Sequence, residues 1–153
     1  MEKEIALKPI GYVNSDVRET VDENWGNVVS RVELYPEYHG GLEGLREFSH
    51  VIILTFLNKS NYKKERHLKR RPRGFDSMPL VGIFSQRAKE RPNPIGVTAV
   101  EIVNVGEDFL EVRGLDAINK TPVLDIKPYF PQYDRVEKPA VPEWANQLMK
   151  NYF

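Results

Sequence analysis

The apolar residues of this chain fall into short β-branched and aromatic runs separated by turn-forming residues, and this spacing limits the fold more than any other feature. Residues 48–57 are apolar on both faces, so we expect a central, covered strand there. Residues 96–105 alternate between two faces, and residues 108–115 follow as a hairpin partner after a turn near Gly106-Glu107. Further strands are predicted at 7–13, 28–34, 80–84 and 123–126.

The pattern gives about six strands with at most two short helices, which indicates a mainly β fold. The helices are expected within 36–47 and over 142–149, and the polar stretch 15–26 is expected to be a loop. Strands do not alternate with long helices, so a doubly wound sheet is disfavoured. We therefore predict a small single-domain β-barrel over residues 1–153, because closure removes the exposed edges of a sheet.

The sequence has no cysteine, which excludes a disulfide scaffold, a cysteine-based zinc site and a cysteine nucleophile. Its three histidines have no ligand-like spacing, so no metal is expected. The charged N-terminus favours the absence of a signal peptide, and the longest apolar run, 51–57, is too short to span a bilayer. These features fit a reducing compartment, and we expect a cytoplasmic location without membrane contact.

The formal net charge is zero, but positive charge is concentrated in residues 59–73. This segment holds eight Lys and Arg residues against Glu65 alone, a local net charge of +7 that leaves −7 for the rest of the chain. Clustered Lys and Arg neutralise phosphates, which makes the segment a candidate RNA-binding arm. We expect a loop with a helical turn over 58–78, and the alternative role is a solvated loop without a partner. The candidate RNA-binding residues are Lys63, Lys64, Arg66, Lys69, Arg70, Arg71 and Arg73.

Residues 87–96 read Arg-Ala-Lys-Glu-Arg-Pro-Asn-Pro-Ile-Gly, with a proline on each side of one asparagine. Pro92 and Pro94 fix their own φ angles and favour extended geometry at Arg91 and Asn93. The stiff turn would hold a guanidinium and an amide at set angles with little entropy to lose, as a ligand-binding loop requires. The alternative is a rigid turn that only leads into the strand 96–105.

A second candidate segment covers residues 115–129, in which Asp116 and Asp125 bracket a polar turn. Asp125 alternates against apolar neighbours at the end of a predicted buried strand. A carboxylate in that position requires a backbone hydrogen bond, an ion pair with Lys127, or a ligand. The alternative role for Asp116 and Thr121 is turn capping, and for Lys127 it is a surface charge.

Five motifs that include these two segments resemble the TsaA-like, or TrmO, family of tRNA methyltransferases over about residues 7–135. In chain order they are Pro9-Ile10-Gly11, Gly44-Leu45 with Phe48-Ser49-His50, Gly82-Ile83-Phe84, Arg91-Pro92-Asn93-Pro94-Ile95-Gly96, and Thr121-Pro122-Val123-Leu124-Asp125-Ile126-Lys127-Pro128-Tyr129. The chain departs from the family pattern at 85–90 and at 22–27.

The resemblance implies a small β-barrel, S-adenosylmethionine as cofactor, tRNA as substrate and a homodimer with the site near the subunit interface. The implied reaction is N6-methylation of threonylcarbamoyladenosine next to the anticodon. Asp125 and His50 are candidate bases, although the plainer role for His50 is structural, and Phe84 or Trp25 is a candidate lining for adenine. The candidate cofactor-binding residues are Phe84, Arg87, Arg91, Pro92, Asn93, Asp116, Thr121, Asp125 and Lys127.

Two other functions remain open from the residues alone. A non-catalytic RNA-binding β-barrel would need only the basic segment, whereas the stiff loop at 91–96 would then have no role. A different small-ligand enzyme or sensor would use the same barrel with another substrate.

Overall fold

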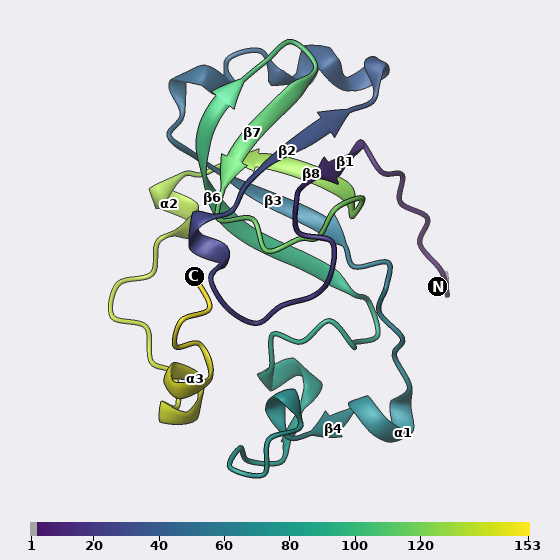
Figure 1. Ribbon diagram of the computed structural model, residues 1–153, viewed down its shortest axis with the longest axis vertical. Helices are drawn as coiled ribbons and strands as arrows, with labels where there is room; N and C mark the ends of the chain where they lie inside the picture. Colours follow the sequence, from purple (N-terminus) through teal and green to yellow (C-terminus); the bar gives the residue numbers. More distant parts are fainter. Residues whose placement is uncertain (1–2) are drawn as a thin grey trace.

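The computed structural model describes residues 3–153 and is built on a closed β-barrel (Figure 1). Met1 and Glu2, where the expectation about a leader segment begins, lie outside the described residues. Every neighbouring pair of barrel strands is antiparallel. Around the barrel the order is β1 (Gly11–Asn14), β2 (Val29–Leu34), β7 (Phe109–Arg113), β6 (Ile95–Val105), β3 (His50–Phe56) and β8 (Pro122–Pro128), which closes on β1. The predicted mainly β barrel is confirmed.

The barrel interior is filled by the inward residues of each alternating strand. In β3, Val51 and Ile53 are fully buried, and their partners across the ladders, Val100 on β6 and Ile126 on β8, belong to the same core. Each buried aliphatic side chain of this size contributes about 1.5–3 kcal/mol relative to its exposed state. Because β3 pairs with β6 on one side and β8 on the other, the central position expected for 48–57 is confirmed.

One end of the barrel is covered by 3-10 helices instead of the single helix predicted within 36–47. They are η2 (Pro36–Leu42) and η3 (Leu45–Glu47), and they bury Leu42 and Leu45 in the core. The prediction of one helix was wrong because Gly44 adopts a φ of 86°, which a continuous helix does not allow. The loop expected over 15–26 is interrupted at its end by a short 3-10 helix, η1 (Trp25–Asn27).

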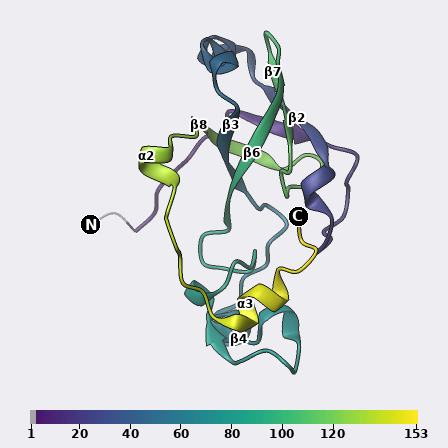
Figure 2. The same cartoon turned by 90° about the vertical axis from the view of Figure 1, so that its left-hand side faces the viewer.

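The basic segment and the residues that follow it to Ser85 fold into a small unit beyond the other end of the barrel, at the bottom of Figures 1 and 2. We call residues 59–85 the basic unit. It contains α1 (Lys64–His67), β4 (Lys69–Arg70), η4 (Pro72–Gly74), β5 (Val81–Gly82) and η5 (Ile83–Ser85), and β4 pairs with β5. The expected helical turn is confirmed as α1. The strand predicted at 80–84 is shorter and lies outside the barrel, because Ile83 turns into η5 and is buried there.

The remaining helices follow the last barrel strand, β8. The two short C-terminal helices are α2 (Pro131–Asp134) and α3 (Glu143–Leu148), so the predicted terminal helix begins directly after Pro142. The strand predicted over 7–13 begins only at Gly11, since Pro9 has no N–H to donate to a ladder. Within residues 3–153 no helix is long and apolar enough to cross a membrane.

Candidate functional site

The two motif segments meet at one end of the barrel, on either side of the end of β3. Thr55 of β3 pairs with Gly96 at the start of β6 and with Val123 at the start of β8. The loop 91–94 runs into β6, and the turn 116–121 runs into β8. Adjacent strands lie about 4.8 Å apart, so the two segments are separated by about two strand spacings.

Arg91 forms hydrogen bonds inside the loop that precedes β6. Its Nη1 donates to the carbonyl of Gln86 at 2.9 Å and to that of Ala88 at 3.2 Å. Arg87 lies on the barrel side of the same loop, where its Nη2 donates to the carbonyl of Val97 at 2.8 Å. The two predicted cofactor-binding arginines therefore shape the loop, and their guanidinium groups already have backbone partners.

Three of the predicted cofactor-binding side chains are presented to solvent at this end of the barrel. Phe84 is 81% exposed on η5, and Pro92 and Asn93 are exposed at the tip of the loop. Trp25, the other candidate for the adenine slot, is 2% exposed, and its Nε1 donates to the carbonyl of Val21 at 2.9 Å. Trp25 is therefore a core residue, and Phe84 is the available aromatic surface.

Asp116 connects the turn before β8 to β6 and to the C-terminal segment. One of its carboxylate oxygens accepts a hydrogen bond from the Thr98 hydroxyl, and the other accepts one from the Tyr152 hydroxyl. The Thr121 hydroxyl donates to the carbonyl of Ile118 at 2.7 Å, so Thr121 caps the turn. Asp116 is thus the polar centre of this end of the barrel.

Sequence reasoning missed Thr98 and Tyr152 as partners of Asp116. Thr98 pairs with the buried Ile53, so its position as a polar residue on the inward face of an alternating strand was the available signal. Tyr152 belongs to none of the motifs and contacts Asp116 across 36 residues. Burial first, and then the charge and hydrogen bond of Asp116, raise the pKa of the Tyr152 phenol above its ordinary value.

Asp125 and Lys127 lie on the outer face of β8 and contact each other. Lys127 Nζ is 2.9 Å from Asp125 Oδ2, and the backbone N–H of Ile126 donates to Asp125 Oδ1 at 2.9 Å. The hydrogen bond to Asp125, and then its negative charge, raise the pKa of Lys127. The backbone hydrogen bond and the ion pair considered for Asp125 are therefore both present.

A β-bulge sets this outward direction. Leu54 on β3 pairs with Asp125, whereas the next residue, Thr55, pairs with Val123, so Leu124 has no partner. The extra residue lets Val123 and Ile126 both face the core.

His50 lies at the opposite end of β3 from the loop 91–94. The strand has seven residues, so His50 is about 20 Å from Phe56 along the ladder. Its Nδ1 is hydrogen-bonded to the Ser49 hydroxyl at 2.7 Å, and its ring lies against Tyr129. Within one chain the structure does not bring the two candidate bases, His50 and Asp125, together.

The predicted RNA-binding residues divide into exposed and engaged side chains. Arg71 donates to the carbonyl of Met78 although it is exposed, and Arg73 lies 3.9 Å from Asp22 and is half-buried. Arg70 is also half-buried, in β4. The exposed residues without such contacts among residues 3–153 are Lys64, Arg66 and Lys69, together with Lys63, whose backbone N–H donates to His67 Nδ1.

Two surface hollows are found. One is bordered by Ser15, Arg31 and Glu111 and lies next to the turn 116–121, since the Ser15 backbone N–H donates to Asn119 Oδ1 at 3.0 Å. The other is bordered by His39 and Arg46 at the opposite end of the barrel. Neither includes the loop 91–96 or the turn 116–121. Among residues 3–153, no group of three or more His, Cys, Asp or Glu side chains is arranged to hold a metal ion.

Comparison with known proteins gives consistent matches over most of the chain. A family model described as the tRNA-methyltransferase O N-terminal domain matches residues 22–135. A probable S-adenosyl-L-methionine-binding protein of Methanothermobacter thermautotrophicus is 38% identical over 137 residues, which cover 87% of this chain and 96% of that protein. The tRNA (adenine(37)-N6)-methyltransferase of Mus musculus is 39% identical over 106 residues, which cover 69% of this chain and 24% of that protein.

The fold is also that of solved structures. A crystal structure of TrmO from Pseudomonas aeruginosa matches 90% of this chain with a TM-score of 0.72 and 29% sequence identity. The match covers 61% of that protein, so the present chain spans about three fifths of its length.

Replacing Tyr152 with Phe is expected to lower the free energy of unfolding by about 1 kcal/mol, since it removes one hydroxyl donor from a partly buried carboxylate. The raised pKa means that the folded chain holds the phenol proton more tightly than the unfolded chain. The contribution of the Tyr152 hydroxyl to the free energy of unfolding is complete below the ordinary tyrosine pKa of about 10 and declines as the pH rises above it. Urea unfolding at several pH values should therefore show the gap between wild type and Tyr152→Phe narrowing above pH of about 10.

The control for this experiment is Tyr133→Phe, because Tyr133 is 84% exposed. It should match wild type at every pH. A gap for Tyr152→Phe that stays constant between pH of about 8 and 11 would contradict the proposed role of the Asp116 contact.

Proposed function

The chain belongs to the tRNA-methyltransferase O family, and on that premise we propose that it is an S-adenosylmethionine-dependent tRNA methyltransferase that acts on N6 of threonylcarbamoyladenosine next to the anticodon. The observation that supports this most is the convergence of the two motif segments at one end of the barrel, beside Thr55. The names of the relatives, an S-adenosyl-L-methionine-binding protein and a tRNA methyltransferase, agree with it. We also propose that residues 1–153 act as one domain in the cytoplasm.

The side chains at this end of the barrel fit the chemistry of an adenosyl group. Phe84 offers an aromatic face for adenine, and the Asn93 amide offers a donor and an acceptor. Pro92 and Pro94 hold that amide in place, so little conformational entropy is lost on binding. Arg87, Arg91 and Thr121 are assigned to shaping the loop and the turn, since their donors already have backbone partners.

Asp116 is the carboxylate best placed to accept from ribose hydroxyls. Its two oxygens already accept from the hydroxyls of Thr98 and Tyr152, which shows that the position is suited to O–H donors. A ribose hydroxyl would then displace one of these two hydroxyls from Asp116, or donate to the same carboxylate oxygen. Tyr152 is the partner on the C-terminal segment, outside the barrel strands.

The chain's own part in the reaction is to align the acceptor nitrogen and receive its proton. When bound, S-adenosylmethionine supplies a methyl group on a sulfonium centre. Alignment contributes most, because the acceptor nitrogen has a delocalised lone pair and is a weak nucleophile. Asp125, which lies on β8 near the converging loops, is our candidate base, and His50 is a weaker one because it lies at the far end of β3.

The proposed RNA-binding surface is the small unit formed by residues 59–85. It lies at the same end of the barrel as the loop 91–94 (Figure 1). Its exposed Lys64, Arg66 and Lys69 provide positive charge for phosphate contacts close to the proposed cofactor site.

We assign the homodimer implied by the resemblance to the outer face of β3 and β6. On β6, Ile95, Val97 and Val103 are apolar and exposed, and Phe56 of β3 lies opposite Ile95. Glu101, between Val97 and Val103, is ion-paired with Arg113. Exposed apolar side chains gathered on one sheet face favour contact with another protein surface. A second copy covering this face would also lie next to Asp125 and Lys127.

Calorimetry and methyl transfer test the function directly. We expect S-adenosylmethionine to bind, and labelled methyl to appear on tRNA that carries threonylcarbamoyladenosine but not on the unmodified tRNA. Binding of the cofactor without transfer to either tRNA would show that the substrate assignment is wrong. A protein that binds tRNA but does not bind S-adenosylmethionine would favour the non-catalytic RNA-binding barrel instead.

The triple replacement of Lys64, Arg66 and Lys69 by Ala should weaken tRNA binding about tenfold or more at physiological salt, because each lost phosphate contact also removes counterion release. The slope of log affinity against log salt should fall by about 0.7–0.9 for each contact that is lost. The affinity for S-adenosylmethionine without RNA should not change. Filter binding over a salt series and calorimetry give these two quantities.

A matched control removes three exposed positive charges outside the basic segment, at Lys8, Arg18 and Arg46. It changes the net charge by the same amount and should leave the salt slope nearly unchanged. Equal effects of the two triple variants would mean that the RNA-binding surface lies elsewhere.

The interface assignment predicts that Val97→Glu converts a dimer into a monomer, because it places a charge in the centre of the proposed apolar contact. Light scattering should give twice the 17.7 kDa chain mass for wild type and the single-chain mass for the variant. The control is Val29→Glu on β2, a residue of similar exposure at 43%. A monomeric wild type, or equal dissociation of both variants, contradicts the assignment.

A further inference from the structure

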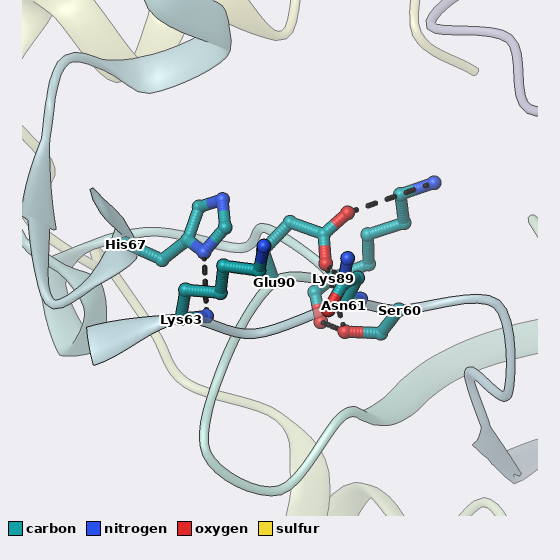
Figure 3. A network of polar contacts seen from close by, with 6 residues as sticks. All are labelled: Ser60, Asn61, Lys63, His67, Lys89 and Glu90. Atoms are coloured by element: carbon teal, nitrogen blue, oxygen red, sulfur yellow. Dashed lines mark hydrogen bonds and ion pairs between the residues drawn. The ribbon is translucent and has the colours of Figure 1, made fainter. Parts of the chain in front are cut away.

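Two segments far apart in sequence lie side by side between the barrel and the basic unit. The backbone N–H of Leu57 donates to the carbonyl of Pro94 at 2.7 Å. Further along, the Ser60 hydroxyl lies 2.7 Å from the carbonyl of Lys89. The chain that leads into the basic segment is therefore joined to the segment 89–94 at two points, and Figure 3 shows the contacts around Ser60.

Glu90 is the centre of this contact. Its Oε2 accepts the backbone N–H of Asn61 and lies 3.0 Å from the Ser60 hydroxyl, while its Oε1 is 3.9 Å from Lys89 Nζ (Figure 3). The Glu90 side chain is only 19% exposed, so these charge-assisted hydrogen bonds are partly shielded from water. Because Arg91 follows directly, a displacement of Asn61 is passed to the loop that carries Pro92 and Asn93.

Gln86 forms a second connection at the other end of the same loop. Its side chain is 6% exposed, and its Nε2 donates to the carbonyls of Arg70 on β4 and Val81 on β5, both at 3.0 Å. The backbone carbonyl of Gln86 accepts a hydrogen bond from Arg91 Nη1. The loop 86–91 is thus fixed to the basic unit at both ends, through Gln86 and through Glu90.

The charges proposed to bind RNA begin immediately after the Glu90 contact. Lys63 follows Asn61 by two residues, and its backbone N–H donates to His67 Nδ1 at 2.8 Å, which closes the first turn of α1 (Figure 3). Phosphates held by Lys64 and Arg66 would therefore act on the segment that Glu90 contacts. When two ligands favour the same arrangement of a shared contact, each raises the affinity for the other.

We propose that Glu90 is a positioning residue that couples RNA binding on the basic unit to cofactor binding at the loop 91–94. Occupancy of the basic unit by tRNA raises the affinity of the loop for the adenosyl cofactor, and by reciprocity the cofactor raises the affinity for tRNA. The coupling rests on the proposed function, because it assumes that the two surfaces bind these ligands. It adds a regulatory role for a carboxylate that directly precedes the loop 91–94.

The test measures the dissociation constant of S-adenosylhomocysteine, which lacks the reactive methyl group, with and without saturating tRNA carrying threonylcarbamoyladenosine. For wild type, tRNA should tighten binding about fivefold or more, the lower part of the usual range of coupling. For Glu90→Ala the ratio of the two constants should fall to about 1, since the link to Asn61 is lost. Glu90→Gln, which retains an amide oxygen as acceptor, should give an intermediate ratio, and it carries the test if Glu90→Ala does not fold.

The matched control is Glu37→Ala, which removes an exposed carboxylate on η2, at the opposite end of the barrel from the loop 91–94. No hydrogen bond or ion pair of the Glu37 side chain is found in the part of the chain from residue 3 to 153. It changes the net charge by the same amount as Glu90→Ala and should keep the wild-type ratio.

The outcomes separate coupling from a merely structural role. A structural defect weakens binding with and without tRNA alike and leaves the ratio unchanged, so an unchanged ratio in Glu90→Ala overturns the proposal. A wild-type ratio of about 1 also overturns it. A wild-type chain that binds neither ligand contradicts the proposed function itself, and the coupling falls with it.

Discussion

The pairing of β3 with β6 on one side and with β8 on the other is the constraint on which the rest of the structure depends. The strand is apolar on both faces, so it is stable only in the middle of a closed sheet. Its neighbours both run antiparallel to it, so both begin where it ends. The segments that precede them, 91–94 and 116–121, are therefore placed together without any direct interaction between their tips. The basic unit continues from the same strand end, which brings a third element to this end of the barrel.

Local patterns were sufficient to predict the barrel, because alternation and turn residues report directly which face of a strand is buried. The hairpin of β6 and β7 and the central position of β3 are examples. Alternation placed Asp125 opposite its apolar neighbour Ile126 but could not show that Val123 also faces the core, since this depends on the bulge at Leu124. Sequence alone also could not show that Trp25 is covered by the C-terminal segment, whose Tyr152 carbonyl accepts the backbone N–H of Trp25.

The candidate site shows the same division between local and non-local information. The motif loop was predicted to be stiff from its prolines alone, whereas the structure adds two hydrogen bonds from Arg91 to carbonyls within the loop. The order of the basic unit was missed, because it depends on the Gln86 side chain reaching β4 and β5 and on the burial of Ile83. A charge run gave no indication of these contacts, which are made by residues outside the run. The functional consequence is that the basic surface is a folded platform with a fixed position relative to the loop.

The unpaired Leu124 has an evolutionary consequence. Regular alternation would place Val123 and Asp125 on the same face, so the extra residue is what lets Val123 face the apolar interior while the carboxylate of Asp125 and the ammonium of Lys127 face outward. A residue gained or lost in the regular part of β8 after the bulge would turn the side chains on one side of the change to the opposite face. Length changes in this family are therefore expected to accumulate in surface connections such as the one between α2 and α3, whereas the spacing within β8 should stay constant.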